Sequence, residues 1–417
     1  MYDAVIIGAG PGGYSCATEI ASLGGRALII ERERVGGTCT NYGCIPTKAL
    51  ISSAGLIEDL AHSSRKGIDA SYTINFEKMM KRKNRIVNTL VRGIKLTIHN
   101  KGIDFLQGEA RIISENRVRV GSQEIEARNI VIATGSEPIK IASGENILTS
   151  REILELTSIP SKLVIIGGGV IGFEFAIIFQ TLGSCVTIIE AMETILPDLD
   201  HDLSAEIERI AQRKGITILV EKKAEINHGI SLDGKEIPFD KVLVAVGRRP
   251  HLPELSGIDY GTVNGKMQTE IDTIYAVGDV TGKNQLAHVA TMQGIVAAHN
   301  IMGQERIMNY ACIPNCIYTL PEIASVGVSE TEGHDVYRAD YAANARARCS
   351  DKLDGFMKIV VDKKSRQIKG VHIIGENATD LIATAVTIIE KKVTREDVLN
   401  MIFPHPTYSE LFIEALK

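Results

Sequence analysis

The chain has 417 residues, of which 44% are hydrophobic and 23% charged, and its formal net charge is −5. This length allows two or three domains with substantial cores, and the composition is that of an ordinary globular protein. The weak negative charge provides no electrostatic basis for binding nucleic acid, and no apolar run reaches the roughly 18 residues that a membrane span needs.

The seven cysteines do not form a disulfide framework in a chain of this size, and their odd number predicts mostly free thiols. Free thiols are typical of a reducing compartment. The first predicted strand, at residues 4–7, begins almost at the first residue, so we expect no signal or transit peptide. We therefore expect a cytoplasmic protein.

Residues 4–31 have the pattern strand, glycine turn, helix, strand, acid. Gly8 and Gly10 would let the backbone turn sharply and approach a pyrophosphate, and Gly13 would let the helix pack closely on the strand. Glu31 falls where a carboxylate can accept hydrogen bonds from ribose hydroxyls. The complete pattern predicts a nucleotide-binding βαβ unit.

Two cysteines four residues apart follow at once, in the stretch Gly-Gly-Thr-Cys-Thr-Asn-Tyr-Gly-Cys-Ile-Pro-Thr-Lys at residues 36–48. Pro46 suits a first helical turn, so Cys44 would lie near a helix N-terminus, which favours a thiolate. The alternatives are two free core cysteines or half of a metal site. Metal pairs are usually closer in sequence and need further ligands nearby, so we predict that Cys39 and Cys44 are redox-active and that the chain holds no metal.

The main basic cluster is Lys-Arg-Lys-Asn-Arg at residues 81–85. Apolar residues at core spacing surround it in a predicted helix. We interpret the cluster as a solvated helix face rather than a ligand site.

Residues 163–190 repeat the first unit, with the residues Gly167, Gly169, Gly172 and Glu190. The first glycine and the acid are 23 residues apart in both copies, 8 to 31 and 167 to 190. Two matched copies predict two nucleotide sites. Glu190 would repel a 2′-phosphate, and no Lys or Arg follows it before residue 208, so the second nucleotide should be NAD rather than NADP.

Three further apolar runs, at residues 130–135, 243–248 and 273–279, read as buried strands that end in a glycine turn or an acid. The acid is Asp279, which could simply cap the next helix. The pattern then changes near Tyr310 to short strands followed by helices at 378–390 and 395–401, which predicts a separate α+β domain.

The chain ends with a histidine between two prolines, in the sequence Phe-Pro-His-Pro-Thr-Tyr-Ser-Glu at residues 403–410. Prolines would hold His405 on a rigid loop, and Glu410 could orient its imidazole as a general base requires. From spacing alone, a surface histidine on a proline-rich turn is the alternative.

Together these motifs resemble those of the flavin-dependent pyridine nucleotide–disulfide oxidoreductases, and within that family those of the members that oxidise dihydrolipoamide. The resemblance runs from end to end. The chain departs from the family in two ways. It is shorter than usual, with the missing residues in the connections between elements, and it has Leu320 where a histidine often precedes Pro-Glu. The motifs on which the resemblance rests are the two glycine–acid units and residues 39–48, 133–135, 247–250, 275–279, 286–288, 318–322 and 405–410.

The resemblance implies an α/β fold with two Rossmann-like domains and a C-terminal α+β dimerisation domain. The FAD-binding domain would comprise residues 1–141 and 266–306, the NAD-binding domain 142–265, and the dimerisation domain 307–417. FAD would be held tightly without a covalent bond, by Gly8, Gly10, Gly13, Glu31, Thr38, Thr134, Gly135, Asp279 and Ala287. NAD would be held by Gly167, Gly169, Gly172, Glu190 and Gly247.

The resemblance also implies a mechanism. His405, oriented by Glu410 and supplied by the opposite subunit of a homodimer, would deprotonate a dithiol such as that of a lipoyl-bearing protein. The thiolate would attack Cys39, while Cys44 would pass the electron pair to FAD and thence to NAD. Lys48 and Glu174 would lie beside the flavin ring.

Other members of the family offer alternatives. An NAD(P)H-dependent reductase of another disulfide is the first of them, although Glu190 argues against an NADP enzyme. Reductases with a second thiol pair near the C-terminus are disfavoured because no cysteine follows His405. A non-enzymatic flavoprotein scaffold is disfavoured because the chain has both cysteines together with His405 and Glu410.

Overall fold

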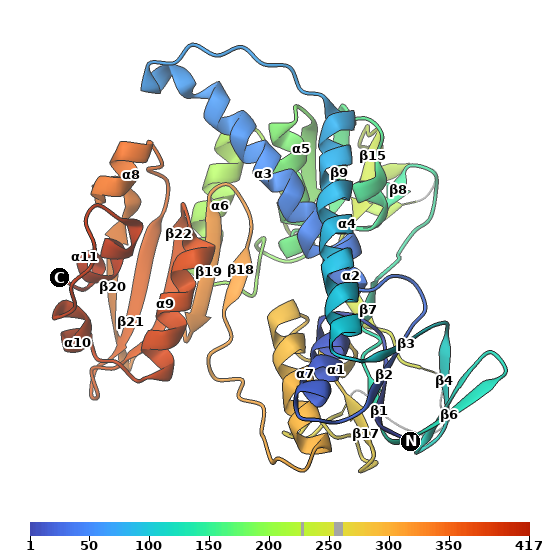
Figure 1. Cartoon of the computed structure of the whole chain (residues 1–417). Helices are drawn as coiled ribbons and strands as arrows, with labels where there is room; N and C mark the ends of the chain where they lie inside the picture. Colours follow the sequence, from blue (N-terminus) through green and yellow to red (C-terminus); the bar gives the residue numbers. More distant parts are fainter. Residues whose placement is uncertain (227–228, 254–261) are drawn as a thin grey trace.

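The computed structural model describes residues 1–226, 229–253 and 262–417, and residues 254–261 of the predicted NAD-binding domain lie outside this part. Figure 1 shows three bodies, each built on its own main sheet: an N-terminal body in blue and gold, a middle body in green and a C-terminal body in orange and red. The fold class predicted from the sequence is confirmed.

The N-terminal body is a seven-stranded sheet with the order β3-β2-β1-β6-β5-β4, in which β17 also pairs with β6. Its central strands β1, β2, β6 and β17 pair in parallel, and the segments that pair are mainly apolar and buried, as strands covered on both faces are. Helices α1 (Pro11–Ser22) and α7 (Ala287–Ile301) pack on each other, although they are far apart in the sequence. The strands are β1 (Tyr2–Ile7), β2 (Ala27–Glu31), β3 (Asp104–Gln107), β4 (Ala110–Ser114), β5 (Arg117–Val120), β6 (Gln123–Ile132) and β17 (Ile274–Ala276).

The middle body is a five-stranded parallel sheet with the order β11-β10-β9-β15-β8. Helix α5 (Val170–Thr181) is buried along most of its length, and α6 (His201–Arg213) is amphipathic. A small antiparallel sheet is appended, and the ribbon of β7 and β16 leads back to the N-terminal body. The strands are β7 (Ser136–Pro138), β8 (Ile147–Leu148), β9 (Lys162–Ile166), β10 (Cys185–Ile189), β11 (Thr217–Leu219), β12 (Glu225–Ile226), β13 (Ile230–Leu232), β14 (Lys235–Glu236), β15 (Lys241–Val244) and β16 (Arg248–Pro250).

The C-terminal body is a five-stranded antiparallel sheet, β18-β19-β22-β21-β20, with helices packed on it, in agreement with the predicted α+β class of the C-terminal domain. Its elements are β18 (Asn315–Ile317), β19 (Glu322–Gly327), β20 (His334–Asp340), α8 (Ala345–Ser350), β21 (Phe356–Asp362), β22 (Ile368–Gly375), α9 (Ala378–Glu390), α10 (Arg395–Leu399) and α11 (Leu411–Leu416). Short 3₁₀ helices lie at η1 (Ser63–Lys66), η2 (Glu152–Glu155), η3 (Gly278–Thr281), η4 (Tyr341–Ala343) and η5 (Tyr408–Glu410).

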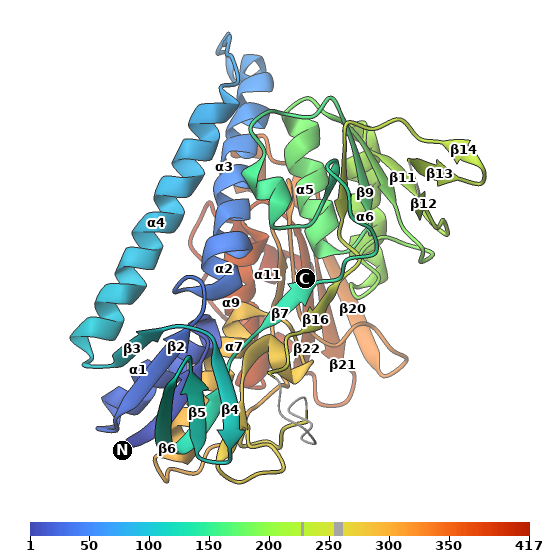
Figure 2. The same ribbon diagram turned by 90° about the vertical axis from the view of Figure 1, so that its right-hand side faces the viewer.

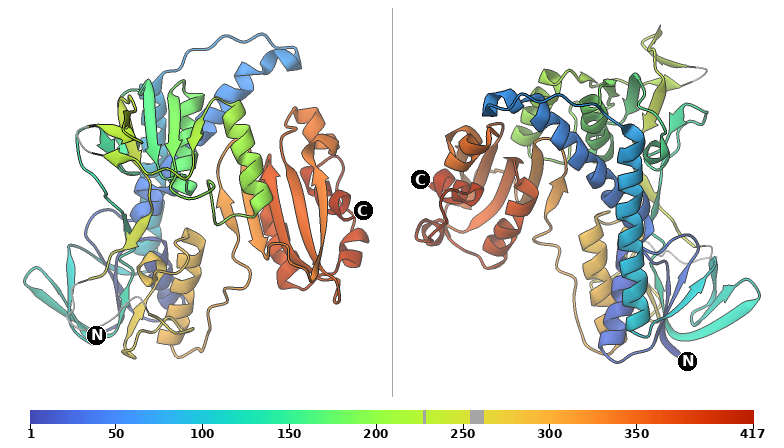
Figure 3. Two further views of the ribbon diagram at one scale, coloured as in Figure 1. Left: turned by 180° about the vertical axis from the view of Figure 1, so that it is seen from behind. Right: turned by 45° about the horizontal axis from the view of Figure 1, so that its top comes forward.

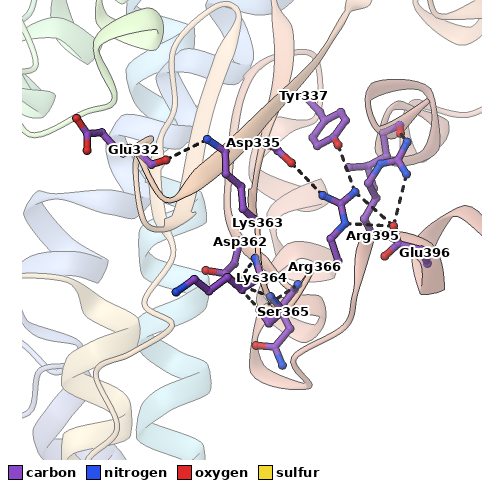
Figure 4. Close-up of polar contacts among 12 residues, drawn as sticks. Glu332, Asp335, Tyr337, Asp362, Lys363, Lys364, Ser365, Arg366, Arg395 and Glu396 are labelled. Atoms are coloured by element: carbon purple, nitrogen blue, oxygen red, sulfur yellow. Dashed lines mark hydrogen bonds and ion pairs between the residues drawn. The ribbon is translucent and has the colours of Figure 1, made fainter.

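Charged side chains connect elements within and between these bodies. Figure 4 shows Arg366, in the turn between β21 and β22, bonded to Asp335 of β20 at 2.9 Å and to Glu396 of α10 at 3.3 Å. The ammonium group of Lys358 is buried against the start of α6, which lies beside the C-terminal sheet in Figure 3, and bonds Asp200 there at 2.9 Å. These contacts fix the C-terminal sheet against its own helix α10 and against the middle body.

Two long helices, α3 (Cys44–Ala61) and α4 (Phe76–Asn100), lie side by side along one flank (Figure 2). The predicted helix around residues 81–85 is confirmed, but the interpretation of the whole cluster as solvated is wrong for Lys83. This lysine is 2% exposed, and its ammonium donates to the carbonyl of Leu154 and lies 3.5 Å from Glu155. Lys83 belongs to the stripe of α4 that faces the core, and the Leu154 carbonyl together with the exposed carboxylate of Glu155 makes its burial tolerable.

Within the described residues, the structure contains no helix that is both long enough and apolar enough to cross a membrane.

Candidate active site

Both predicted glycine turns require glycine at their first and last positions. Gly8 has φ +108°, and a Cβ atom there would lie 2.3 Å from the carbonyl oxygen of residue 133; one on Gly13 would lie 2.0 Å from the oxygen of Gly8. Gly167 has φ +105°, and a Cβ on Gly172 would lie 2.1 Å from the oxygen of Gly167. The turns therefore bring the N-termini of α1 and α5 close to their strands, where backbone N–H groups suit a phosphate.

The two predicted acids are buried at the ends of β2 and β10 and make matching contacts. Glu31 accepts hydrogen bonds from the N–H groups of residues 9 and 33, at 2.8 and 2.7 Å. Glu190 accepts them from residues 168 and 192, at 2.6 and 2.8 Å. Each carboxylate oxygen can accept a further bond, so both acids remain able to bind a ribose hydroxyl.

A cavity of about 1480 Å³ runs past the first glycine turn to the cysteine pair and the start of α5. Its size exceeds that of a site for a drug-sized ligand and suits a whole dinucleotide. From the predicted FAD set it is lined by Gly8, Gly10, Glu31, Thr38, Thr134, Gly135, Asp279 and Ala287, and it also contains Cys39, Cys44, Lys48 and Glu174. Gly13 and the five predicted NAD residues are not among the described residues that line it.

The cysteine pair lies where α2 (Gly37–Tyr42) meets α3, and Cys44 is the first residue of α3, as predicted. Both cysteines are free thiols in this structure. The hydrogen bond from Cys39 and the nearby Lys48 cation lower the pKa of Cys44 to about 7, against the effect of burial. The same hydrogen bond and burial raise the pKa of Cys39. Cys44 is therefore the thiol of the pair that ionises more readily, and Cys39 is the one that retains its proton.

Residues from the three bodies meet beside Cys44. The ammonium of Lys48 on α3 bonds both oxygens of Glu174 on α5, at 2.8 and 2.9 Å. The backbone N–H of Tyr318, just after β18, donates to the same carboxylate at 2.9 Å, and its ring face lies 4.4 Å from the ammonium. The structure thus brings together Lys48 and Glu174, as the resemblance implied. Tyr318 was not predicted as a site residue.

A second set of hydrogen bonds includes Asp279, at the start of η3. The hydroxyl of Ser136 donates to Asp279 at 2.5 Å, and Arg248 of β16 donates to that hydroxyl at 2.8 Å and to the Ser136 carbonyl at 2.7 Å. The alternative role of Asp279, as the cap of a helix, receives no support, because no side-chain cap bond is present at η3. Sequence reasoning missed Ser136 and Arg248, although Arg248 lies within one of the quoted motifs.

His405 contacts Glu410, as the spacing suggested, with 2.9 Å between Nδ1 and the carboxylate. The N–H of Thr407, at 2.8 Å, and the imidazole hold the pKa of Glu410 below its usual range. The His405 side chain is 69% exposed, and neither residue is among those described as lining the cavity. Within one chain, the structure therefore does not bring His405 to the cysteines.

Comparison with known proteins places this geometry in a family. The Pyridine nucleotide-disulphide oxidoreductase description matches residues 2–294, and the dimerisation domain of that family matches residues 313–416. Dihydrolipoyl dehydrogenases of Bacillus subtilis and Chlamydia pneumoniae are 36% and 38% identical to this chain over 99% of its length and 97% and 96% of theirs.

Solved structures are similar over the whole chain as well. The HOCl-induced flavoprotein disulfide reductase RclA of Escherichia coli has a TM-score of 0.91 at 28% identity, covering 100% of this chain and 99% of its own. LpdA of Mycobacterium tuberculosis has a TM-score of 0.93 at 25% identity, covering 99% and 98%. The chain belongs to the pyridine nucleotide-disulphide oxidoreductase family.

Proposed function

We propose that the chain is a dihydrolipoyl dehydrogenase, which oxidises the dithiol of a lipoyl group to a disulfide and reduces NAD⁺. The observation that carries this proposal is the free Cys39–Cys44 pair, which lies in one cavity with the first glycine turn and with Glu174 of the second unit. Full-length relatives of that name, at 34–38% identity, support the substrate.

We further propose which residues hold the cofactors. The glycine turn at 8–13 with Glu31, together with the lining residues Thr38, Thr134, Gly135, Asp279 and Ala287, fits FAD, because Gly8 and Gly13 leave no room for a Cβ and so form the tight turn that a pyrophosphate needs. Gly167, Gly169, Gly172, Glu190 and Gly247 would hold NAD. When bound, FAD accepts the electron pair from the thiols and delivers it as hydride to NAD⁺. The domain boundaries at residues 141/142, 265/266 and 306/307 belong to the same proposal.

The protein's own groups handle protons and sulfur. His405, held by Glu410, accepts a proton from one substrate thiol. The substrate thiolate attacks Cys39 of the Cys39–Cys44 disulfide, that bond breaks, and Cys44 leaves as a thiolate next to Lys48. The second substrate thiol then displaces Cys39, which leaves with a proton, and the product disulfide forms.

The position of His405 supports a homodimer with a shared active site. The side chain is exposed and outside the cavity of its own chain, and the matched dimerisation domain includes both His405 and Glu410. A second copy would bring this base to the cysteines of the first. We also propose a lipoyl-bearing protein as the partner and the cytoplasm as the compartment, which the odd number of cysteines in the sequence favours.

An anaerobic titration tests the function. The yellow protein is treated with dihydrolipoamide and then with NAD⁺ or NADP⁺, while the flavin spectrum and the absorbance of the reduced nucleotide are recorded. Reduction of the flavin by the dithiol, with NADH formed far faster than NADPH, is the expected result. A flavin that NADH reduces but dihydrolipoamide does not would refute the proposal and indicate a reductase of another disulfide.

A further inference from the structure

The Lys48 ammonium is held from three directions by groups far apart in the sequence. Lys48 comes from α3, the Glu174 carboxylate that pairs with it comes from α5, and the aromatic face at 4.4 Å comes from Tyr318. The carboxylate is 6% exposed and the lysine side chain 27% exposed, so solvent reaches this pair only in part. Tyr318 also lines the cavity that contains the cysteines.

The ring of Tyr318 acts separately from its backbone. The backbone N–H donates to Glu174 at 2.9 Å, and a substitution of the side chain would leave that bond in place. Within the described residues, no hydrogen bond to the phenol hydroxyl is found, so the ring face is the part of the side chain that contacts the lysine. A cation over an aromatic face at this distance is attracted to it, and more strongly where water is excluded.

We propose that Tyr318 is a positioning residue whose ring keeps the Lys48 ammonium against Glu174 and beside the thiolate of Cys44. This inference rests on the proposed function, in which Cys44 is the thiol that remains ionised. Tyr318 itself does not react. It sets how strongly the charge of Lys48 acts on its neighbours.

Loss of the Tyr318 ring would change the pKa of Cys44 in one direction, upward. The groups that act on the pKa of Cys44 are Cys39 and Lys48, which lower it, and Glu174, which raises it together with burial. Arg248 and Tyr318 also interact electrostatically with Cys44. Without the ring, water would reach the ammonium and its side chain would gain rotamers. The attraction between Lys48 and the thiolate would weaken, and the pKa of Cys44 would rise.

The test measures that pKa directly and needs neither dihydrolipoamide nor NAD. The FAD-loaded protein is reduced anaerobically and alkylated with iodoacetamide between pH 5 and 9, and mass spectrometry follows the modification of Cys44. Tyr318→Leu should raise the pKa of Cys44 by about half a unit, which slows alkylation about threefold below pH 7. The matched control Tyr318→Phe, which retains the ring, should titrate like the wild type.

A double-mutant cycle separates positioning from general damage. In a Lys48→Met background, Tyr318→Leu should cause no further shift, because the charge it positions is absent. Tyr318→Met replaces the leucine variant if that variant does not retain flavin. An unchanged pKa in the variants without a ring, an equal shift in Tyr318→Phe, or an equal shift without Lys48 would each overturn the inference. Because no substrate is used, the result stands whether or not the chain proves to oxidise dihydrolipoamide.

Discussion

The two glycine–acid units, β1–α1–β2 and β9–α5–β10, share their backbone contacts and differ in what surrounds their turns. In the first unit, the redox loop packs directly on the turn: the N–H of Gly36 donates to residue 9 at 2.8 Å, and a Cβ on Gly37 would lie 2.7 Å from the Cα of Gly10. In the second unit, a Cβ on Gly169 would meet no atom within 4 Å. The N–H of Leu196 donates to the second turn in the same way, at the carbonyl of Gly168 and 3.0 Å, so the two turns differ only at their middle glycine: Gly10 lies against the backbone of Gly37, and Gly169 faces open space.

This difference suits the two cofactors that we propose. A middle glycine that lies against neighbouring backbone favours a group that stays bound, and one that faces open space favours a group that enters and leaves in each cycle. The helices differ too, because α5 carries the buried Glu174 two residues after its last glycine, where α1 carries Ser15. In the proposed function, a similar βαβ unit would hold a bound cofactor in one copy and an exchanging one in the other.

The largest effect is expected from replacing Cys44, which lies in the cavity that contains residues of both units. Cys44→Ser should lower dithiol-dependent NAD⁺ reduction by more than about a thousandfold, because a hydroxyl can neither form the disulfide nor leave as a thiolate. FAD should remain bound, as judged by the flavin spectrum of the purified protein. Cys185→Ser, at an exposed cysteine on β10, is the control and should retain full activity. Residual dithiol turnover in Cys44→Ser would contradict the disulfide mechanism.

The next largest effects are expected from substituting the last glycine of each turn, which tests which cofactor each turn binds. Gly13→Ala and Gly172→Ala each place a Cβ about 2 Å from a carbonyl oxygen, a clash expected to cost about 1–3 kcal/mol or more. Gly13→Ala should yield protein without flavin. Gly172→Ala should retain flavin but lose NADH-linked turnover about a hundredfold.

The control for this pair is Gly93→Ala, in α4, where the added Cβ meets nothing within 4 Å. It should retain both flavin and turnover. Loss of flavin in Gly172→Ala, or its retention in Gly13→Ala, would mean that the two sites have been assigned the wrong way round.

Removing the acids should have a smaller effect. Glu190→Ala removes a carboxylate that would repel a 2′-phosphate, so kcat/KM for NADP⁺ relative to NAD⁺ should rise about tenfold. Glu31→Ala should leave that ratio unchanged and weaken flavin retention instead. Steady-state kinetics with both nucleotides measures the ratio, and an unaltered preference in Glu190→Ala would count against its contact with ribose.

The smallest expected effect is the pH dependence of the rate at which Cys44 is alkylated. Because the pKa of Cys44 is lowered to about 7, its thiolate should predominate above that pH and be lost below it. Alkylation of the reduced protein should therefore slow about fivefold from pH 7 to pH 6. A titration midpoint above 8.5, the value of an ordinary thiol, would show that Lys48 and Cys39 do not stabilise the thiolate.

Much of the fold and part of the site could be predicted because their signals are local. The spacing from glycine to acid, the proline after Cys44 and the five-residue step from His405 to Glu410 each lie within one short segment, and the structure contains the corresponding turns, helix start and contact. The assignments of cofactor residues remain predictions that the experiments above would test.

Contacts between distant segments could not be predicted from local patterns. Lys48 meets a residue 126 positions away and Glu174 one 144 positions away, and only the resemblance indicated the first of these pairs. Nothing in the sequence around Tyr318 marks its ring as the neighbour of a lysine. Lys83 is different: its spacing to Met80 and Val87 places it on the buried stripe, and the basic run obscured that signal.

The outward position of His405 has a consequence for how such a protein changes over generations. If the base on the surface of one chain serves the cysteines of another, the catalytic set belongs to the pair of chains and to neither alone. A substitution on that surface would then alter assembly and chemistry together. A change that weakens the contact between the chains would therefore also lower the rate of turnover. Selection for turnover would thereby also maintain the dimer, without any separate benefit from being dimeric.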